Sequence, residues 1–319
     1  MMYKTKLTKI NLKKMANPVI PTNYAGEFAG IYLAAAFKQS KSLEFLSTIE
    51  NIKFKRTMQQ LSDTQSSDHM IKEASCDFDA QGNLTLTDKV LEPKLLEVNL
   101  QLCKNDVLAD WQSAQMRAGA HNSDFSQDFM AFVFSYVAGH IGQHIENNIW
   151  KGSGSGSQFD GFTTATTGAF ALDGNVNAVT KTAAFDATTI IANIEKAIAA
   201  IPSGVYTADD LYLYMNDVSY RYYIDAVSKL GYLNAYNMQG DYVPMANGVK
   251  IAVCPGVPND TIIAAKKSHL YFGTDLISDA TEVKMLDMSN LDGSDNIRLI
   301  AKFSGGVQCG PGADIVHLS

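Results

Sequence analysis

The sequence predicts an α+β fold, and three observations lead to that prediction. Apolar residues recur at helical spacing over residues 124–150, which predicts one long helix. Short apolar or alternating segments bounded by turn residues predict strands in both halves of the chain. The helices and strands do not alternate strictly, so a doubly wound parallel sheet is not expected. The chain of 319 residues, 46% hydrophobic and 18% charged, is long enough for one large domain or two ordinary ones.

The N-terminal segment is basic, although the whole chain carries a formal net charge of −7. The first 14 positions hold five lysines and no acidic residue: Lys4, Lys6, Lys9, Lys13 and Lys14. This tail is either a solvated terminus or an arm that lies against a polyanion or an acidic neighbouring subunit. It lacks the apolar core of a signal peptide, so export is not expected, and no apolar run in the chain is long enough to span a membrane. Residues 26–46, rich in Ala and Leu, predict a short helix.

Residues 51–58 and 84–88 predict the two strands of a long hairpin. The apolar residues of the first strand are expected on one face and its lysines on the other: Ile52 and Phe54 against Lys53 and Lys55. A polar stretch at 59–72 and a turn at 81–83 separate the strands. Such a hairpin has too little apolar content to bury a core of its own. It is therefore expected to be marginal or to be held by another chain.

The middle of the chain predicts a strand, a short helix and then the long helix. Alternation at 94–102 places Leu96, Val98, Leu100 and Leu102 on one face, and 105–111 predicts a short helix. The long helix at 124–150 has Ser123 or Asp124 as its N-cap and stops at Lys151–Gly152. At 1.5 Å per residue it would be roughly 40 Å long, which is the length of a structural spine.

The second half of the chain predicts a mixture of helices and strands. Helices are expected at 185–201 and 217–231, and a loop at 232–248. Buried or alternating strands are expected at 209–216, 249–258, 261–266 and 269–276, and the end of the chain predicts a strand, a turn and a strand.

The run "WKGSGSGSQFDGF" at 150–162 follows a helix, whereas a phosphate-binding loop precedes one. A Walker A motif needs a GK pair that this run lacks, and a dinucleotide fingerprint needs a glycine where Ser157 stands. The spacing therefore favours a flexible connection between two subdomains.

Two histidines of the long helix, His140 and His144, are spaced i, i+4, but "HIGQH" lacks the glutamate of a metalloprotease motif and no third ligand is indicated. The carboxylate pairs Asp77/Asp79 and Asp209/Asp210 are typical of a turn or a solvated cap, and so is 290–296. The tyrosines between 212 and 236 lack interleaved basic residues, which favours packing over nucleic-acid stacking. The four cysteines are scattered without CxxC spacing, as expected of reduced thiols, and exclude a zinc finger. No catalytic, metal or cofactor site is expected.

The order of several motifs resembles the major capsid proteins of tailed double-stranded DNA phages with the Hong Kong 97 fold. Within that family, the motifs look most similar to those of phages that infect Bacteroidetes hosts, including crAss-like phages. The motifs are "NYAGEFAGIYLAAAF", "LEPKLLEVNLQLCKNDVLADW", "NIWKGSGSGSQFDGF", "LYMNDVSYRYYIDAVSKLGY" and "MANGVKIAVCPGVPNDTIIAAKKSHLYFGTDL".

The resemblance implies a domain layout and a set of contact residues. Residues 1–48 would be an N-terminal arm and 49–90 the extended loop over a neighbouring subunit. Residues 91–151 and 281–319 would form the peripheral domain, and 152–280 the axial domain. Residues implied at subunit contacts are Ile52, Lys53, Phe54, Lys55, Leu84, Leu86, Tyr232, Tyr236 and Tyr242. The lysine arm would face DNA or another subunit.

The resemblance further implies a non-enzymatic protein, found in the virion capsid and assembled in the host bacterial cytoplasm. It would form hexamers and pentamers around double-stranded DNA, with portal and scaffolding proteins as partners. Some members form lysine–asparagine cross-links, and Lys53, Lys55 and Lys72 lie in the corresponding loop, but no asparagine partner is identified. Alternatives are an encapsulin-like shell around protein cargo, a soluble α/β enzyme with a site near His140 and His144, and a phage tail or adhesin subunit.

Overall fold

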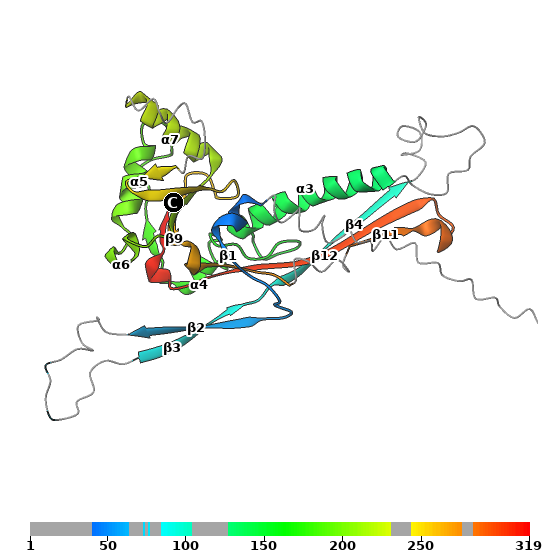
Figure 1. The fold of residues 1–319 in the computed structure, drawn as a ribbon, viewed down its shortest axis with the longest axis horizontal. Coiled ribbons are helices and arrows are strands. Elements are labelled where there is room, and N and C mark those ends of the chain that lie inside the picture. The colour runs from blue at the N-terminus through cyan, green and yellow to red at the C-terminus, as the bar shows by residue number, and fades with distance from the viewer. Residues whose placement is uncertain are drawn as a thin grey trace, which may run out of the picture.

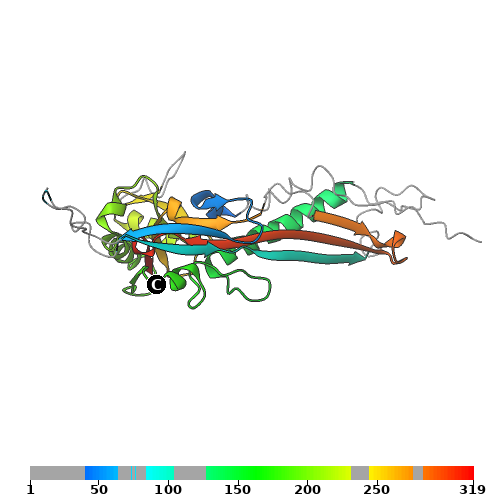
Figure 2. The ribbon, with the colours of Figure 1, turned by 90° about the horizontal axis from the view of Figure 1, so that it is seen from below.

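The computed structural model describes residues 40–63, 73, 76, 84–103, 127–230, 244–275 and 283–319. This part of the chain is elongated, with a lobe of short helices around a sheet at one end and a long helix over strands at the other (Figure 1). Seen after a quarter turn, the molecule is thin for its length (Figure 2). The α+β class predicted from the sequence is confirmed.

A five-stranded sheet runs along the extended part of the molecule. Its order is β1 (Ser47–Ile49), β10 (Leu270–Gly273), β12 (Asn296–Cys309) and β11 (Val283–Asp287), with β4 (Lys94–Cys103) also pairing with β12. The long strand β12 is antiparallel to β4, β10 and β11, and β1 is parallel to β10. The predicted strand at 94–102 is therefore confirmed as β4.

The long helix α3 (Gln127–Lys151) packs along this sheet, where Figure 1 shows it above β4 and β12. Its 25 residues confirm the predicted spine and its stop before Gly152. The residues that recur at helical spacing form the buried stripe: Val133, Phe134, Val137, Ala138, Ile141, Ile145, Ile149 and Trp150. They pack with sheet residues such as Leu96, Leu299 and Phe303 in one core.

The lobe contains a six-stranded sheet with its own core. The order is β5 (Asn177–Val179), β13 (Val316–Leu318), β9 (Ile262–Lys266), β6 (Leu211–Met215), β8 (Val249–Val253) and β7 (Met245–Ala246). Three helices accompany it: α5 (Ile190–Ala199), α6 (Ser203–Tyr206) and α7 (Asp217–Lys229). The core includes Ile190, Ile194, Leu213, Ile262 and Val316. The last strand thus joins the lobe, so the sheets do not follow the domain boundary expected at 280/281.

The two-stranded hairpin consists of β2 (Arg56–Asp63) and β3 (Leu84–Leu91), which pair antiparallel along eight positions. Figure 1 shows the hairpin leaving the body below the lobe. The short remaining elements are η1 (Lys41–Phe45), α4 (Ala169–Asp173), η5 (Lys267–His269), η7 (Met288–Asn290) and η8 (Gly312–Asp314).

Three local predictions were wrong. The first hairpin strand begins at Arg56, not at residue 51, and it includes residues 59–63 of the polar stretch. Ile52 is 4% exposed while Phe54 is 83% exposed, so these two side chains do not share a face. The predicted helix at 185–201 begins only at Ile190, because the Asp186 carboxylate accepts hydrogen bonds from the backbone N–H groups of Thr188 and Thr189 and forms a turn there.

The glycine-rich run at 150–162 is a loop held by its own hydrogen bonds, whereas the sequence predicted a flexible connection. Gly161 N–H donates to the Gly152 carbonyl at 2.8 Å, and a side chain at Gly152 would collide with the Phe159 carbonyl oxygen. Gly154 has φ of +69°, a conformation that favours glycine. The Lys94 ammonium donates to the carbonyls of Gly154 and Gln158, which ties the loop to the start of β4.

Candidate assembly surfaces

One side of the hairpin is fixed to the body. Leu91 is fully buried, and it lies so close to Gly273 that a side chain there would meet it at 2.7 Å. Lys89 makes an ion pair of 2.6 Å with the Asp173 carboxylate at the end of α4 and donates to the Gly310 carbonyl. Gln308 Nε2 donates to the Val90 carbonyl at 2.9 Å. These contacts hold the C-terminal end of β3 against the body. The residues of β3 that lie nearer the tip of the hairpin make none of them.

The opposite side of the hairpin presents an apolar surface to solvent. Because side chains alternate along a strand, the even-numbered residues of β3 face away from Lys89 and Leu91. Leu86 stands directly opposite Leu61 in the register, and Leu84 and Val90 continue the row. These four residues, called the hairpin outer face below, are 43–61% exposed. Their exposure agrees with the expectation that the hairpin cannot bury a core of its own.

The turn before β2 carries an exposed aromatic ring among cations. Ile52 is buried beneath it, and its backbone N–H donates to the Thr274 carbonyl at 3.2 Å. Phe54 points away from the body, and Lys53 and Lys55 on either side of it are exposed. Ile52 therefore packs within its own chain, and its expected role in a subunit contact stays a prediction.

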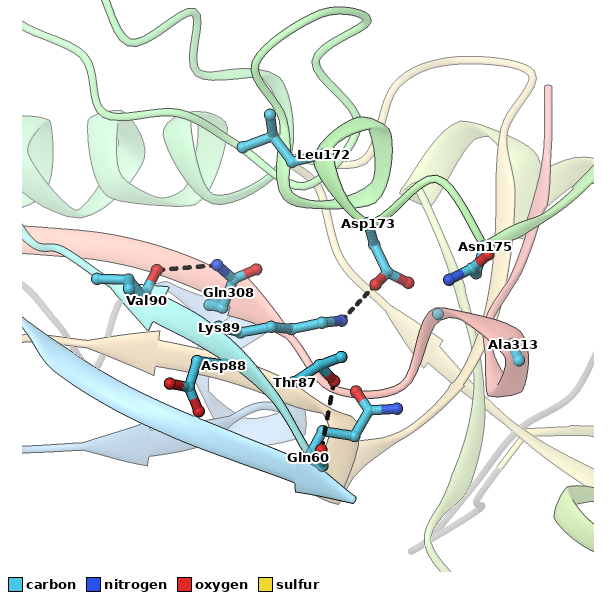
Figure 3. Close-up of a pocket in the computed structure, with 11 residues that line it drawn as sticks. Gln60, Thr87, Asp88, Lys89, Val90, Leu172, Asp173, Asn175, Gln308 and Ala313 are labelled. Atoms are coloured by element: carbon cyan, nitrogen blue, oxygen red, sulfur yellow. Dashed lines mark hydrogen bonds and ion pairs between the residues drawn. The ribbon is translucent and has the colours of Figure 1, made fainter. Parts of the chain in front are cut away.

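A cavity of about 750 Å³ lies between the hairpin and α4. Figure 3 shows Leu172 and Asp173 on one side of it, Gln60, Thr87 and Lys89 on the other, and Ala313 at one end. The Lys89–Asp173 ion pair bridges the two sides, with side chains only 15% and 9% exposed. We call this cavity the hairpin cleft.

A buried carboxylate joins the start of the described chain to α3. Glu146 accepts hydrogen bonds from the Ser40 hydroxyl at 2.7 Å, from the Ser42 N–H and hydroxyl at 3.0 and 2.6 Å, and from the Gly256 N–H at 3.0 Å. Trp150 Nε1 donates to the Ser42 hydroxyl at 2.7 Å. The four groups that contact the Glu146 carboxylate are all hydrogen-bond donors, so they occupy its acceptor sites. No lone pair of this carboxylate is left to act on a substrate. Its function is structural: it fixes residues 40–42 against the spine.

The two histidines of α3 do not converge on a site. The exposed His140 ring packs against Tyr136 with 4.6 Å between ring centroids, and His144 Nε2 lies 2.8 Å from the Ser157 carbonyl oxygen. Among the residues that the structure describes, no group of three His, Cys, Asp or Glu side chains could hold a metal ion.

The other candidate residues have ordinary structural partners. Asp210 accepts hydrogen bonds from the hydroxyl and N–H of Ser268, which lower its pKa. Asp292 caps a turn by accepting from Ser294, and its pKa is lowered for the same reason. The tyrosines that the structure describes are dispersed: Tyr214 is buried with its hydroxyl donating to the Phe45 carbonyl, while Tyr220 and Tyr223 stack on α7.

Several predicted contact residues fall outside the described part of the chain: the arm lysines Lys4, Lys6, Lys9, Lys13 and Lys14, Lys72 of the loop, and Tyr232, Tyr236 and Tyr242. Residues 26–39 of the helix expected at 26–46 also lie there, as do the helix expected at 105–111 and residues Asp77 and Asp79. The described end of that helix is the short 3-10 helix η1 at Lys41–Phe45. Lys53, Phe54, Lys55, Leu84 and Leu86 are described, and all five are exposed. Their role in a subunit contact stays a prediction.

Sequence reasoning missed Leu61, Val90, Lys89 and Asp173. Leu61 stood in a stretch taken as polar, and its i±2 neighbours Gln59 and Asp63 are polar too, so no apolar alternation indicated a strand there. The Lys89–Asp173 pair joins residues 84 positions apart, and no local pattern indicates such a contact.

Comparison with known proteins gives a structural likeness only. No family model matches the sequence, and no curated protein matches it. The capsid of an empty GTA particle is 14% identical, with a TM-score of 0.55 over 88% of this chain and 89% of that one. A structure from Gordonia phage Cozz is 12% identical, with a TM-score of 0.55 over 88% and 86% of the two chains. A virus-like particle from Pyrococcus furiosus is 8% identical, with a TM-score of 0.51 over 90% and 96%.

The chain has the Hong Kong 97-type capsid fold. The alignments run over nearly nine-tenths of each chain, so the likeness includes both sheets and the spine helix and is not limited to one motif. The fold predicted from the motif order is thus confirmed. As for membranes, none of the helices in the described ranges is both long and apolar enough to cross one.

Proposed function

We propose that this chain is a major capsid protein that assembles into the hexamers and pentamers of an icosahedral shell around phage double-stranded DNA. The observation that carries the proposal is the hairpin outer face on a chain with a capsid fold. A strand pair that exposes Leu61, Leu84, Leu86 and Val90 gains stability only when another surface covers them. The activity is mechanical enclosure and not catalysis.

The hairpin outer face is large enough to matter for association. Fully burying an aliphatic side chain contributes about 1.5–3 kcal/mol, and these four are roughly half exposed. Covering them would therefore contribute about 3–6 kcal/mol before the cost of association is subtracted. One such contact is weak, but every subunit of a closed ring makes it twice, once as donor and once as acceptor.

The finer assignments rest on the sequence. In this proposal residues 1–48 form the N-terminal arm, 49–90 the extended loop, 91–151 with 281–319 the peripheral domain, and 152–280 the axial domain. The last strand, β13, is the exception, because it returns to the sheet of the lobe. The lysine arm faces DNA or an acidic neighbour, which suits a chain of net charge −7. Portal and scaffolding proteins are the proposed partners, the virion is the location, and the motif order favours a crAss-like lineage.

Electron microscopy and light scattering of the expressed chain test the proposal. The wild-type chain should form closed shells or rings of five and six copies. The double variant Leu61→Ser/Leu86→Ser should stay unassembled but folded, since both side chains are exposed in the single chain. A matched control, Leu291→Ser, alters an equally exposed leucine on the η7–β12 turn and should assemble normally. A wild-type chain that stays monomeric with and without a scaffolding protein would overturn the proposal.

A shell around protein cargo is the second candidate, because the fold is shared by a virus-like particle and does not itself specify what the shell encloses. The content of particles recovered from cells that carry the gene separates the two. Nuclease-protected double-stranded DNA supports the phage capsid, and a defined protein inside a particle free of DNA supports the alternative.

A further inference from the structure

The sheet formed by β4, β12 and β11 has one covered side and one open side. The side chains of Leu96, Leu299 and Phe303 point toward α3 and are buried in the core that they share with it. Because side chains alternate along a strand, the residues between them point to the opposite side, which Figure 2 shows with α3 behind it. We call this opposite side of the three strands the outer sheet face.

The outer sheet face carries a cluster of cations. Arg298 and Lys302 stand two positions on either side of Ile300 in β12, and Lys284 of β11 stands directly opposite Ile300 in the register. None of the three cations makes an ion pair with another described residue. Among the described positions of this face only Glu97 is acidic. The face therefore has an excess of positive charge.

Apolar side chains lie among these cations. Leu95 is 67% exposed at the start of β4, and Ile300 and Leu286 are partly exposed. Leu286 stands directly opposite Arg298, so apolar and cationic groups alternate across the strands. A surface of this composition suits a partner that is itself apolar and carries negative charge.

The hairpin outer face has that complementary composition. The register places the Asp88 side chain on it, between Leu86 and Val90 and directly opposite Gln59. Asp88 is exposed and makes no ion pair with a described residue. The other polar side chains described on this face, Thr57 and Gln59, are uncharged. A row of apolar groups with one unpaired carboxylate thus meets the requirement set by the outer sheet face.

The two faces cannot meet within one chain. Figure 1 shows the hairpin extending below the lobe toward one end of the molecule, while β4 and β11 extend toward the other end. Their lengths are nevertheless similar. The hairpin pairs over eight positions and β4 pairs with β12 over ten, which correspond to about 26 and 33 Å at 3.3 Å per residue. A contact between them therefore needs two copies of the chain.

We propose that the hairpin outer face of one copy lies on the outer sheet face of a neighbouring copy, with Asp88 facing Arg298 and Lys284. The apolar side chains on either side of Asp88 would then pack against Ile300. The inference rests on the proposed assembly function and adds to it the surface that receives the hairpin. Because the two faces are different parts of one chain, the contact is head-to-tail, and such contacts produce rings when the rotation closes.

Photo-crosslinking identifies the surface that receives the hairpin. Position 59 is suitable for p-benzoylphenylalanine, because Gln59 is exposed beside Asp88 and its replacement leaves the apolar row intact. Irradiation of assembled particles should join chains, and mass spectrometry should find the attachment within 95–101, 284–286 or 298–304 of the second chain. Attachment to other regions of the neighbouring copy would overturn the inference.

Charge exchange measures how much the contact contributes. Asp88→Lys places a cation against cations, so it should raise the protein concentration needed for assembly by about tenfold or more, and by a larger factor at low salt. The double variant Lys284→Glu/Arg298→Glu should weaken assembly in the same way. Combining the three substitutions should restore it, because the charges are then exchanged between the two faces.

A matched control is Glu195→Lys, which makes the same change of charge at an exposed position of α5 in the lobe. It should assemble at the wild-type concentration. Because Asp88 is exposed in the single chain, the thermal midpoints of unassembled wild type and Asp88→Lys should agree, which excludes misfolding as the cause of any loss.

The outcomes separate this inference from the function on which it rests. Wild-type particles together with an Asp88→Lys variant that assembles at the same concentration as Glu195→Lys would overturn the contact and leave the capsid function standing. Failure of the combined variant to recover would equally count against the pairing of these two faces. A wild-type chain that never assembles would overturn both the contact and the function.

Discussion

Replacing Glu146 by Ala removes the acceptor that joins three segments distant in sequence. In the native chain its carboxylate accepts from Ser40, from both donors of Ser42 and from the Gly256 N–H. The two serine hydroxyls can rotate toward other acceptors. The backbone N–H groups of Ser42 and Gly256 cannot, because the chain holds them in place.

The size of the effect follows from those two groups. A buried donor left without a partner costs about 1–3 kcal/mol, so Glu146→Ala should lower the free energy of unfolding by about 2–6 kcal/mol. For a chain of 319 residues that corresponds to a fall of about 3–9 °C in the thermal midpoint. Glu146→Gln keeps one acceptor oxygen but turns an amide NH₂ toward the donors, so its loss should be intermediate.

Thermal unfolding of the unassembled chain, followed by circular dichroism, measures this effect. The matched control is Glu195→Ala, which removes an exposed glutamate from α5. Limited proteolysis adds a local readout, because cleavage after Lys41 should accelerate in Glu146→Ala and not in the control. A Glu146→Ala midpoint within about 1 °C of the control would refute the assigned role of the network, since even one orphaned donor should shift it further.

Three further predictions concern the hairpin, the histidines and the cysteines. Lys89→Met leaves the buried Asp173 carboxylate unpaired, which should cost on the order of 3 kcal/mol and raise hydrogen exchange in β3 without changing exchange in α7. Burial lowers the pKa of His317 below 6.5, so as the pH falls the unfolded chain takes up a proton before the folded chain does. The stability contributed by the neutral ring should therefore be complete above pH 6.5 and should fall as the pH drops toward the lower pKa of the folded state. His317→Gln should flatten the plot of stability against pH over that range. Burial raises the pKa of Cys309 to about 11, whereas Cys76 is exposed, so a thiol reagent at pH 8 should label Cys76 in the native chain and Cys309 only after denaturation. Equal labelling rates at both cysteines would contradict this burial.

Elements whose signal is local could be predicted from the sequence. The apolar stripe of α3 recurs every three or four residues within one segment, so its period identified the helix almost to its last residue. The alternation of β4 and the apolar run of β6 did the same for two strands. The order of these segments resembles that of the Hong Kong 97-type capsid proteins, and this resemblance predicted the fold.

Features that depend on distant contacts could not be predicted. Ile52 is in a four-residue alternation that imitates a strand, but its side chain is buried because Gly273 leaves space for it. The Glu146 donors lie more than a hundred residues away on both sides. The hairpin cleft exists only because α4 comes to lie beside β3, which no pattern in either segment encodes.

The long strand β12 has a mechanical consequence. It pairs with β4 over ten positions, with β11 over five and with β10 over four, and the chain then continues into the lobe as β13. Fourteen residues of strand span roughly 46 Å at 3.3 Å per residue. Tension along the molecule would load these ladders in shear, where many hydrogen bonds must slip together, and not in peeling, where they open one at a time. A wall built from such subunits would stretch elastically before any subunit unravels.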